Sequence, residues 1–288
     1  MRNLQGLSEV LENFDALILD LWGLIHDGVT AYPGVIKTFE GLRDNGVRTI
    51  LLSNAPRRSQ LLVEGMANMG IGRDLYDDIF SSGEATNIEL ISRQDPFFQS
   101  LGRAVYHIGP DRDTSVLDGT NIEKNQCIKK ADFILNTGPV LLTHGVTDYK
   151  EVLFEAMQLK LPMVCANPDE VVVRGGKRVI CAGALARYYE ELGGTVVYRG
   201  KPDPAIYKLA IDRLGMRDSS RVAVVGDSLA TDVAGANAAN LKSIWCTGGI
   251  HADALGVSYG EVADTNKARA YALSVGHMPW ATIASFRL

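Results

Sequence analysis

Acidic residues close two apolar runs of the sequence. Asp20 ends ALILD, and Asp227 ends VAVVGD and is followed five positions later by Asp232. Carboxylates that converge on one place repel each other unless a cation lies between them. Oxygen ligands with room for water suit Mg²⁺. If the fold brings these acids together, we expect them to hold a magnesium ion.

Two further apolar runs end in neutral or basic polar residues. Ser53 and Asn54 close LLSN, and Lys201 follows VVYRG. A hydroxyl, a backbone N–H and an ammonium group together suit the outer oxygens of a phosphoryl group. Asp20 could then attack phosphorus as a nucleophile. Each residue alone would equally suit a helix cap, a turn or a solvated surface position, so the inference depends on the ordered set.

The elements that must position these residues alternate between strand and helix patterns. Strand-like runs cover 16–21, 47–54, 196–200, 221–228 and 242–249, and helix patterns begin near Pro33 and cover 57–69, 204–214 and 230–239. This order predicts an α/β fold with a doubly wound, mainly parallel sheet, and the continuously apolar runs indicate strands covered on both faces. In such sheets the ligand crevice lies at the carboxyl ends of the strands, where the polar residues stand.

The middle of the chain carries its own set of element patterns. They predict strands over 104–109, 131–138 and 163–167, a helix over 148–159 and a hairpin over 171–179. We therefore predict a Rossmann-like core formed by residues 1–83 and 186–288, and an inserted α/β cap formed by residues 84–185. The alternating apolar residues of the last segment, 278–288, predict a final strand or a terminal packing segment.

The bulk composition favours small-molecule chemistry. The 288 residues include 34 acidic and 29 basic ones, for a net charge of -5, and no basic run suggests a nucleic acid polymer or a membrane as partner. No apolar run is long enough for a membrane helix, and the first residues lack the pattern of a signal peptide, so we expect a cytoplasmic protein. A homodimer is compatible with the sequence. The cysteines show no CxxC pair, and we expect small buried apolar roles for Cys127, Cys165, Cys181 and Cys246.

The ordered set resembles the haloacid dehalogenase (HAD) superfamily of phosphohydrolases. DLWG at 20–23 matches the nucleophile motif in part, while LLSN at 51–54, GKPDP at 200–204 and VVGDSLATD at 224–232 match the other three. The long interval between Asn54 and Lys201 places the cap between the second and third motifs, as in the class II arrangement. HDG, YPG, SSGEAT and ANPDE are similar to the NagD-like, nitrophenylphosphatase-type branch, class IIA. The resemblance extends from about residue 14 to residue 250.

The resemblance implies a role for each matching residue. Asp20 would be the nucleophile, Ser53 and Lys201 would hold the phosphate together with Asn54, and Asp227 and Asp232 would hold Mg²⁺ with Asp20. Asn167 and Asp169, where the cap returns to the core, would face the substrate. The implied activity is a magnesium-dependent phosphatase acting through an aspartyl-phosphate on a small phosphorylated metabolite, such as a sugar phosphate or a nucleotide.

Trp22 departs from this family pattern. Phosphatases of the family usually carry a second Asp at this position, where it serves as general acid and base. Side chains two apart on a strand share a face, so the indole should point to the same crevice as Asp20. An indole N–H donates a hydrogen bond but exchanges no proton near neutral pH. The backbone carbonyl that serves the metal in the family is still present at Trp22.

The substitution leaves several interpretations open. Without a general acid, turnover of esters with poor leaving groups should be slow, because such help is worth about 10² to 10⁴ in rate. His26 or Asp27 is a weaker candidate for a replacement acid, and Trp22 itself could pack on the cap or form a platform for an aromatic or sugar-like substrate. The alternative function is a catalytically impaired relative that binds a phosphorylated ligand. Carbon–halogen chemistry ranks last, because the metal-binding acids are present.

Overall fold

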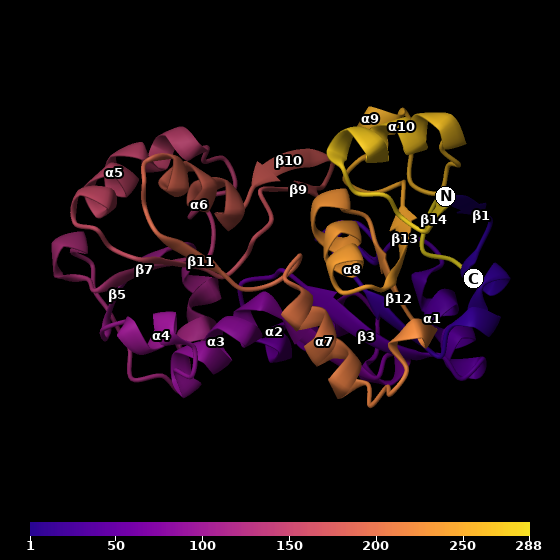
Figure 1. Cartoon of the computed structure of the whole chain (residues 1–288), viewed down its shortest axis with the longest axis horizontal. Helices are drawn as coiled ribbons and strands as arrows, with labels where there is room; N and C mark the ends of the chain where they lie inside the picture. The colour runs from indigo at the N-terminus through magenta and orange to yellow at the C-terminus, as the bar shows by residue number, and fades with distance from the viewer.

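The computed structural model describes residues 1–288 and has two lobes joined side by side (Figure 1). Each lobe contains its own parallel sheet, one of seven strands and one of five, and an antiparallel hairpin lies between the lobes. The doubly wound α/β fold with an inserted cap is therefore confirmed. None of the helices is both long and apolar enough to cross a membrane.

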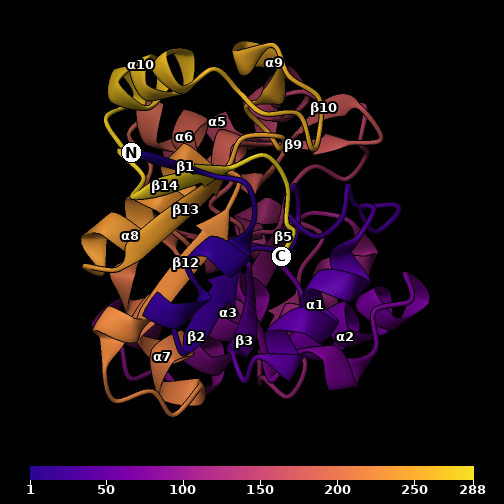
Figure 2. The ribbon, with the colours of Figure 1, turned by 90° about the vertical axis from the view of Figure 1, so that its right-hand side faces the viewer.

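The larger sheet forms the centre of the core domain. Its strands run in the order β1-β14-β13-β12-β2-β3-β4, and every neighbouring pair is parallel. Figure 2 shows these strands as one twisted sheet with helices on either side. The strands are β1 (Arg2–Leu4), β2 (Ala16–Leu19), β3 (Arg48–Ser53), β4 (Asp78–Ser81), β12 (Val222–Gly226), β13 (Lys242–Cys246) and β14 (Ala281–Ile283).

Both faces of this sheet are apolar because alternate residues of each strand enter different layers. Leu17 and Leu19 of β2 pack with helices α1 (Val35–Asp44) and α2 (Ser59–Asn68). Ile18 packs on the opposite face with α7 (Pro204–Arg213) and α8 (Ala234–Ala238). The buried four-residue run of β2 therefore has no polar face, and Asp20 is the first polar residue after it.

The smaller sheet forms the cap domain, with strand order β11-β8-β7-β5-β6 and all neighbours parallel. Helices α5 (Lys150–Gln158) and α6 (Ala182–Glu191) cover one face, and α3 (Ser82–Ser92) and α4 (Pro96–Ser100) lie on the other (Figure 1). The strands are β5 (Ala104–Ile108), β6 (Glu123–Lys124), β7 (Phe133–Asn136), β8 (Met163–Cys165) and β11 (Val196–Tyr198).

The predicted hairpin is confirmed. Strand β9 (Val171–Arg174) pairs in antiparallel register with β10 (Lys177–Ile180). The connecting glycines, Gly175 and Gly176, have φ of 52° and 75°, which suits a tight hairpin turn that needs positive φ at both central residues. In Figure 1 the hairpin extends from the cap towards the helices of the core.

Several expectations need correction. The run at 196–200 is a strand, but β11 pairs with β8 in the cap sheet, so we place the second domain boundary after Tyr198 and not near residue 185. Cys127 is exposed, because it lies in the loop after the short edge strand β6, whereas the other three cysteines are buried. Helices α9 (Ala252–Leu255) and α10 (Thr265–Val275), which pack near Trp245 of β13, were not predicted. The segment at 278–288 does form a strand, β14.

Candidate active site

Three carboxylates meet at the carboxyl ends of neighbouring strands. Asp20 follows β2, Asp227 follows β12, and Asp232 lies one turn further on in the π-helical segment η8 (Leu229–Val233). Their side-chain oxygens lie within 4.8 Å of one another, and all three residues are buried. Gly23 and Gly249 allow this closeness, because a Cβ at either position would collide with the Asp227 carboxylate. The acids that the sequence singled out therefore do converge.

Lys201 forms ion pairs with two of these acids. It stands in the segment between β11 and α7, and its Nζ donates to Asp20 Oδ1 at 2.5 Å and to Asp232 Oδ1 at 2.7 Å. The lysine is only 3% exposed, so both ion pairs are shielded from water. Asp227 is held by a different donor, the backbone N–H of Ile250, at 2.7 Å from Oδ2. The ammonium group of Lys201 thus pairs with two of the three converging carboxylates.

The electrostatics of the cluster follow from burial and from the excess of negative charge. Burial raises the pKa of Asp20 to about 7; Lys201 opposes this shift and Asp232 adds to it. Burial and the charges of Asp20 and Asp232 also raise the pKa of Asp227 well above its ordinary value. For Lys201 burial acts against the charge, but Asp20 and Asp232 outweigh it and raise the pKa. A further cation would relieve the repulsion among the acids.

The three carboxylates fit a hard divalent cation. They offer oxygen donors only, they lie close enough to share one ion, and a single lysine leaves their charge undercompensated. Asp20 Oδ2 accepts no hydrogen bond from the chain, so it is free to bind an ion or a substrate atom. Asp20, Asp227 and Asp232 would hold the ion, and the backbone carbonyl of Trp22 would stand beside them on the same segment.

Asn54 holds the second and third motifs together through its side chain. Its Oδ1 accepts from the Lys201 N–H at 2.8 Å, and its Nδ2 donates to the Lys201 carbonyl at 3.1 Å and to Asp169 Oδ1 at 2.9 Å. The sequence indicates a role for the backbone N–H of Asn54, and the structure adds this role of its side chain. Ser53 is buried next to it, and its Oγ accepts from the Ala55 N–H at 3.2 Å. Asn167 is also buried and holds the backbone N–H of Asp169 through its Oδ1 at 3.0 Å.

Trp22 lines the same cavity as Asp20, as its spacing predicted, and it also contacts the cap. Its indole N–H donates to the carbonyl of Val173 in β9 at 2.7 Å, and the Arg174 guanidinium lies 5.8 Å from the ring centroid. The ring lies so close to Gly28 that a Cβ there would collide with it. Trp22 therefore links the core to the cap hairpin.

Neither neighbouring candidate for a replacement acid lines the cavity. His26 is buried, and its Nδ1 accepts a hydrogen bond from the Gly28 N–H at 3.0 Å. Burial lowers the pKa of His26 to about 4, although the charge of Asp27 opposes the shift. Asp27 accepts from the N–H groups of Val29 and Thr30 at 2.8 and 2.7 Å, so it stabilises a turn. Both residues support the loop that follows Trp22.

The cavity between the domains has a volume of about 380 Å³. Its lining includes residues of the core loops and of the cap hairpin β9–β10, and of the predicted catalytic, substrate-binding and metal-binding residues only Asp232 does not line it. Lining residues that the motifs did not indicate include Arg57, Arg112, Arg174 and Ile250. They come from segments far apart in the chain, and no local pattern marks them. The sequence-predicted residues that line it are Asp20, Trp22, Ser53, Asn54, Asn167, Asp169, Lys201 and Asp227.

Comparisons with known proteins identify the family of the chain. A family model described as haloacid dehalogenase-like hydrolase matches residues 17–123, and one described as HAD-hydrolase-like matches residues 198–267. Over 245 residues the chain is 28% identical to the ribonucleotide monophosphatase NagD of Escherichia coli (strain K12), and the match covers 81% of this chain and 88% of that protein.

Solved structures show the same fold over the whole chain. A haloacid dehalogenase-like family hydrolase from Brucella suis 1330 has a TM-score of 0.83 and 32% identity, and the match covers 98% of this chain and 99% of that one. A glycerol phosphate phosphatase from Mycobacterium tuberculosis, solved in complex with magnesium, has a TM-score of 0.64 and 22% identity, with 90% and 78% covered. At that lower identity the likeness is one of fold.

Proposed function

Because the chain belongs to the haloacid dehalogenase-like hydrolases, in their NagD-like class IIA branch, we propose that it is a magnesium-dependent phosphatase of a small phosphorylated metabolite. The observation that carries the proposal is the convergence of Asp20, Asp227 and Asp232 around Lys201 at one end of an interdomain cavity. A cytoplasmic location and a homodimer stay predictions.

In the proposed reaction Asp20 attacks phosphorus through Oδ2, the oxygen that accepts no hydrogen bond from the chain. The bond from phosphorus to the ester oxygen breaks, and the alcohol departs with a proton from solvent. Water then attacks the aspartyl-phosphate and regenerates the Asp20 carboxylate with release of inorganic phosphate. Lys201 and Ser53 would hold the outer phosphoryl oxygens, and Asn54 fixes the backbone of Lys201.

Mg²⁺, when bound, would offset the charge of the carboxylates and of the phosphoryl oxygens. The buried, oxygen-only donor set supports this assignment, and the magnesium complex of the mycobacterial phosphatase is consistent with it. Trp22 supplies no proton, so we propose that turnover is slow for alkyl phosphates, whose leaving oxygen needs protonation. Substrates with good leaving groups, such as 4-nitrophenyl phosphate, need that help less.

Phosphate release from a broad panel of phosphomonoesters with Mg²⁺ tests the proposal. We expect measurable hydrolysis by the wild-type protein, loss of it in Asp20→Asn, and retention in Asp44→Asn, whose carboxylate is exposed on α1. Circular dichroism would establish that each variant is folded. No release from any ester by the wild type, together with no effect of Asp20→Asn, would overturn the proposal.

The alternative is a protein that binds a phosphorylated ligand without hydrolysing it. It is favoured by one observation, the engagement of the Trp22 indole with the Val173 carbonyl at the position of the usual acid. Hydrolysis that is abolished by Asp20→Asn would exclude this alternative. Saturable binding of phosphate esters without any turnover would establish it.

A further inference from the structure

Three arginines from separate segments line the same cavity as the acids. Arg57 lies in the loop between β3 and α2, Arg112 in the 3-10 helix η4 (Asp111–Leu117) of the cap, and Arg174 in β9 of the hairpin. No nitrogen of these side chains lies within 4 Å of a carboxylate oxygen of Asp20 or Asp227, so none of them forms an ion pair with these acids. We call this group the arginine cluster.

Arg57 and Arg112 both lie within 4 Å of the same oxygen, Asp113 Oδ1, so their guanidinium groups are close together. Burial lowers the pKa of Arg57, and the positive charges of Arg112 and Arg174 lower it further, while Asp113 opposes them. Like charges held together inside a partly buried cavity raise the free energy of the folded protein unless an anion lies between them.

The chain supplies too little negative charge to balance the cluster. Asp113 is the one carboxylate that pairs with it, at 3.3 Å from Arg57 Nε and 3.8 Å from Arg112 Nε. Arg174 pairs with no carboxylate and faces the Trp22 ring. Asp253 also lines the cavity but lies beyond 4 Å from every arginine nitrogen. One paired carboxylate against three guanidinium groups leaves an excess of positive charge.

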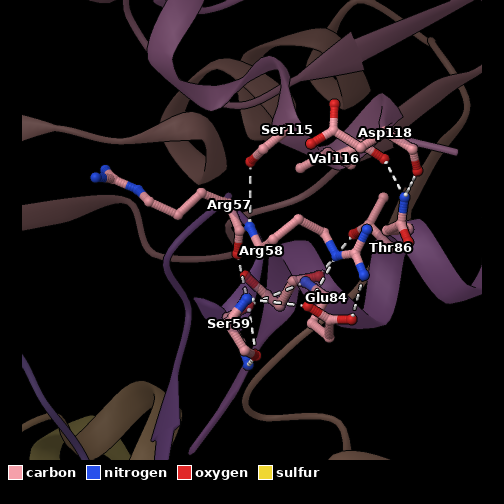
Figure 3. Close-up of polar contacts among 11 residues, drawn as sticks. Arg57, Arg58, Ser59, Glu84, Thr86, Ser115, Val116 and Asp118 are labelled. Carbon is pink, nitrogen blue, oxygen red and sulfur yellow. Dashed lines mark hydrogen bonds and ion pairs between the residues drawn. The ribbon is translucent and has the colours of Figure 1, made fainter. Parts of the chain in front are cut away.

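Arg58, the next residue after Arg57, is an arginine whose charge is paired within the protein. Arg58 donates to Glu84 through two nitrogens, at 2.8 and 2.9 Å. Figure 3 shows the Arg58 side chain turned towards Glu84, whereas the Arg57 side chain extends away from this network. Arg57 Nε forms the ion pair with Asp113, but the guanidinium group makes no hydrogen bond. Guanidinium groups pair most favourably with carboxylate or phosphate oxygens, and Arg57 has donors free for one.

We propose that the arginine cluster binds a second anionic group of the substrate, so that the preferred phosphomonoester carries a carboxylate or another phosphate on the part released with the leaving oxygen. This proposal rests on the proposed function for its reaction, but the binding site is independent of turnover. Asp20 and Lys201 would take the phosphoryl group that reacts, and Arg57, Arg112 and Arg174 would take the other end of the molecule.

Matched sugar phosphates test the proposal. Glucose 6-phosphate carries one anionic group, 6-phosphogluconate adds a carboxylate, and glucose 1,6-bisphosphate adds a phosphate. We expect kcat/KM for at least one of the doubly anionic esters to exceed that for glucose 6-phosphate by about tenfold or more, the ratio of a single charge-assisted hydrogen bond. The doubly anionic ester with the higher kcat/KM shows whether the second group is a carboxylate or a phosphate.

Variants assign the preference to the cluster. The double substitution Arg112→Gln and Arg174→Gln should bring the ratio of kcat/KM values close to one. Arg187→Gln is the matched control, because Arg187 is an exposed cap arginine paired with Glu170 and lines no part of the cavity, and it should keep the wild-type ratio. A ratio near one in the wild type, or an unchanged ratio in the double variant, would overturn the proposal.

Calorimetry separates this proposal from the proposed reaction. Binding of glucose 6-phosphate and 6-phosphogluconate is measured with Mg²⁺ on the Asp20→Asn protein, with and without the double substitution. A tenfold difference in Kd that disappears with the arginines, without hydrolysis by the wild type, would mean that the binding site is right and the reaction wrong. Hydrolysis by the wild type with no preference for the doubly anionic ester, either in kcat/KM or in Kd, would mean that the reaction is right and the second binding site is wrong.

Discussion

At the scale of single residues, Trp22 departs from the motif that the sequence otherwise matches around Asp20. The sequence predicts that its side chain faces the crevice, because it follows Asp20 by two positions. Its partner could not be predicted: the Val173 carbonyl lies 151 positions away, and no local pattern indicates a contact of that range. In the structure the Trp22 side chain forms a contact between the core and the cap.

Trp22→Asp tests whether the missing acid limits turnover. We expect hydrolysis of alkyl phosphates to rise relative to that of 4-nitrophenyl phosphate, by as much as about 10² for a well-placed acid. The measurement is the ratio of kcat values for the two kinds of substrate. Trp22→Phe is the control, because it removes the hydrogen bond to Val173 without supplying an acid, and it should change both rates alike. Equal changes in Trp22→Asp would contradict the prediction.

His26 makes the stability of the protein depend on pH. Its pKa is about 4 in the folded chain and 6.5 in the reference state, so the unfolded chain binds more protons between these values. The stability that comes from keeping the imidazole neutral is present above pH 6.5 and is lost as the pH falls towards 4. For this buried side chain the loss is on the order of 3 kcal/mol.

His26→Asn isolates that contribution. Asn offers an oxygen near the place of Nδ1, where the Gly28 N–H donates, but it does not titrate. We expect the free energy of unfolding in urea to fall less for the variant than for the wild type between about pH 7 and about pH 4. Other titrating groups are common to both proteins and cancel in the difference. The same loss in both would show that His26 is not responsible.

At the scale of elements, the central strands of the core were predictable, whereas the edge strands β1 and β4 and the membership of one short strand were not. Continuous apolar runs that end in Asp20 and Asp227 locate two central strands and, with them, the edge where the acids meet. The run around Val196–Tyr198 has the same apolar character, but three residues suit either sheet, and tertiary pairing with β8 decides the matter. Helices α9 and α10 lie outside the part of the chain that the motifs cover.

The turn of the hairpin β9–β10 offers a test of its role at the site. Gly176 lines the cavity, has a φ of 75° and has free space around its Cβ position, so Val and Asn there differ mainly in how well they tolerate this backbone conformation. Gly176→Val should strain the turn by about 1–2 kcal/mol, because branched residues disfavour positive φ, whereas Gly176→Asn should be tolerated. We expect faster hydrogen exchange at residues 171–180 and a higher KM for the Val variant only. Matching behaviour of the two variants would refute this.

At the scale of the whole molecule, the site exists only where the two domains meet. The acids and Lys201 lie at the core, Trp22 and Asn54 reach residues of the returning cap chain, and the arginines come from both sides. The motif residues reveal the core half from sequence, because each closes an apolar run. The residues that the cap contributes depend on how the core sheet and the cap sheet are placed relative to each other. The spacing of apolar residues along the chain carries no information about this placement.

Magnesium should stabilise the whole protein if the three acids hold it. At about a hundred times its Kd, a ligand that binds only the folded state adds about 2.7 kcal/mol, which is several degrees in Tm for a chain of this size. Without metal, Asp227→Asn should raise the Tm, because it removes one of three repelling buried carboxylates.

The same variant should lose the rise in Tm that Mg²⁺ produces, while the exposed Asp44→Asn keeps it. Thermal unfolding with Mg²⁺ and with EDTA measures both. A rise of equal size in the two variants would place the ion elsewhere.

The strand order of the core sheet has a consequence for how the chain folds during synthesis. Strand β1 pairs only with β14, so residues 2–4 cannot join the sheet until residue 283 has left the ribosome. The cap sheet is formed by one uninterrupted stretch of chain and can assemble earlier. We therefore expect the cap to be the first cooperative unit on the nascent chain, and the core edge to be the last region to close.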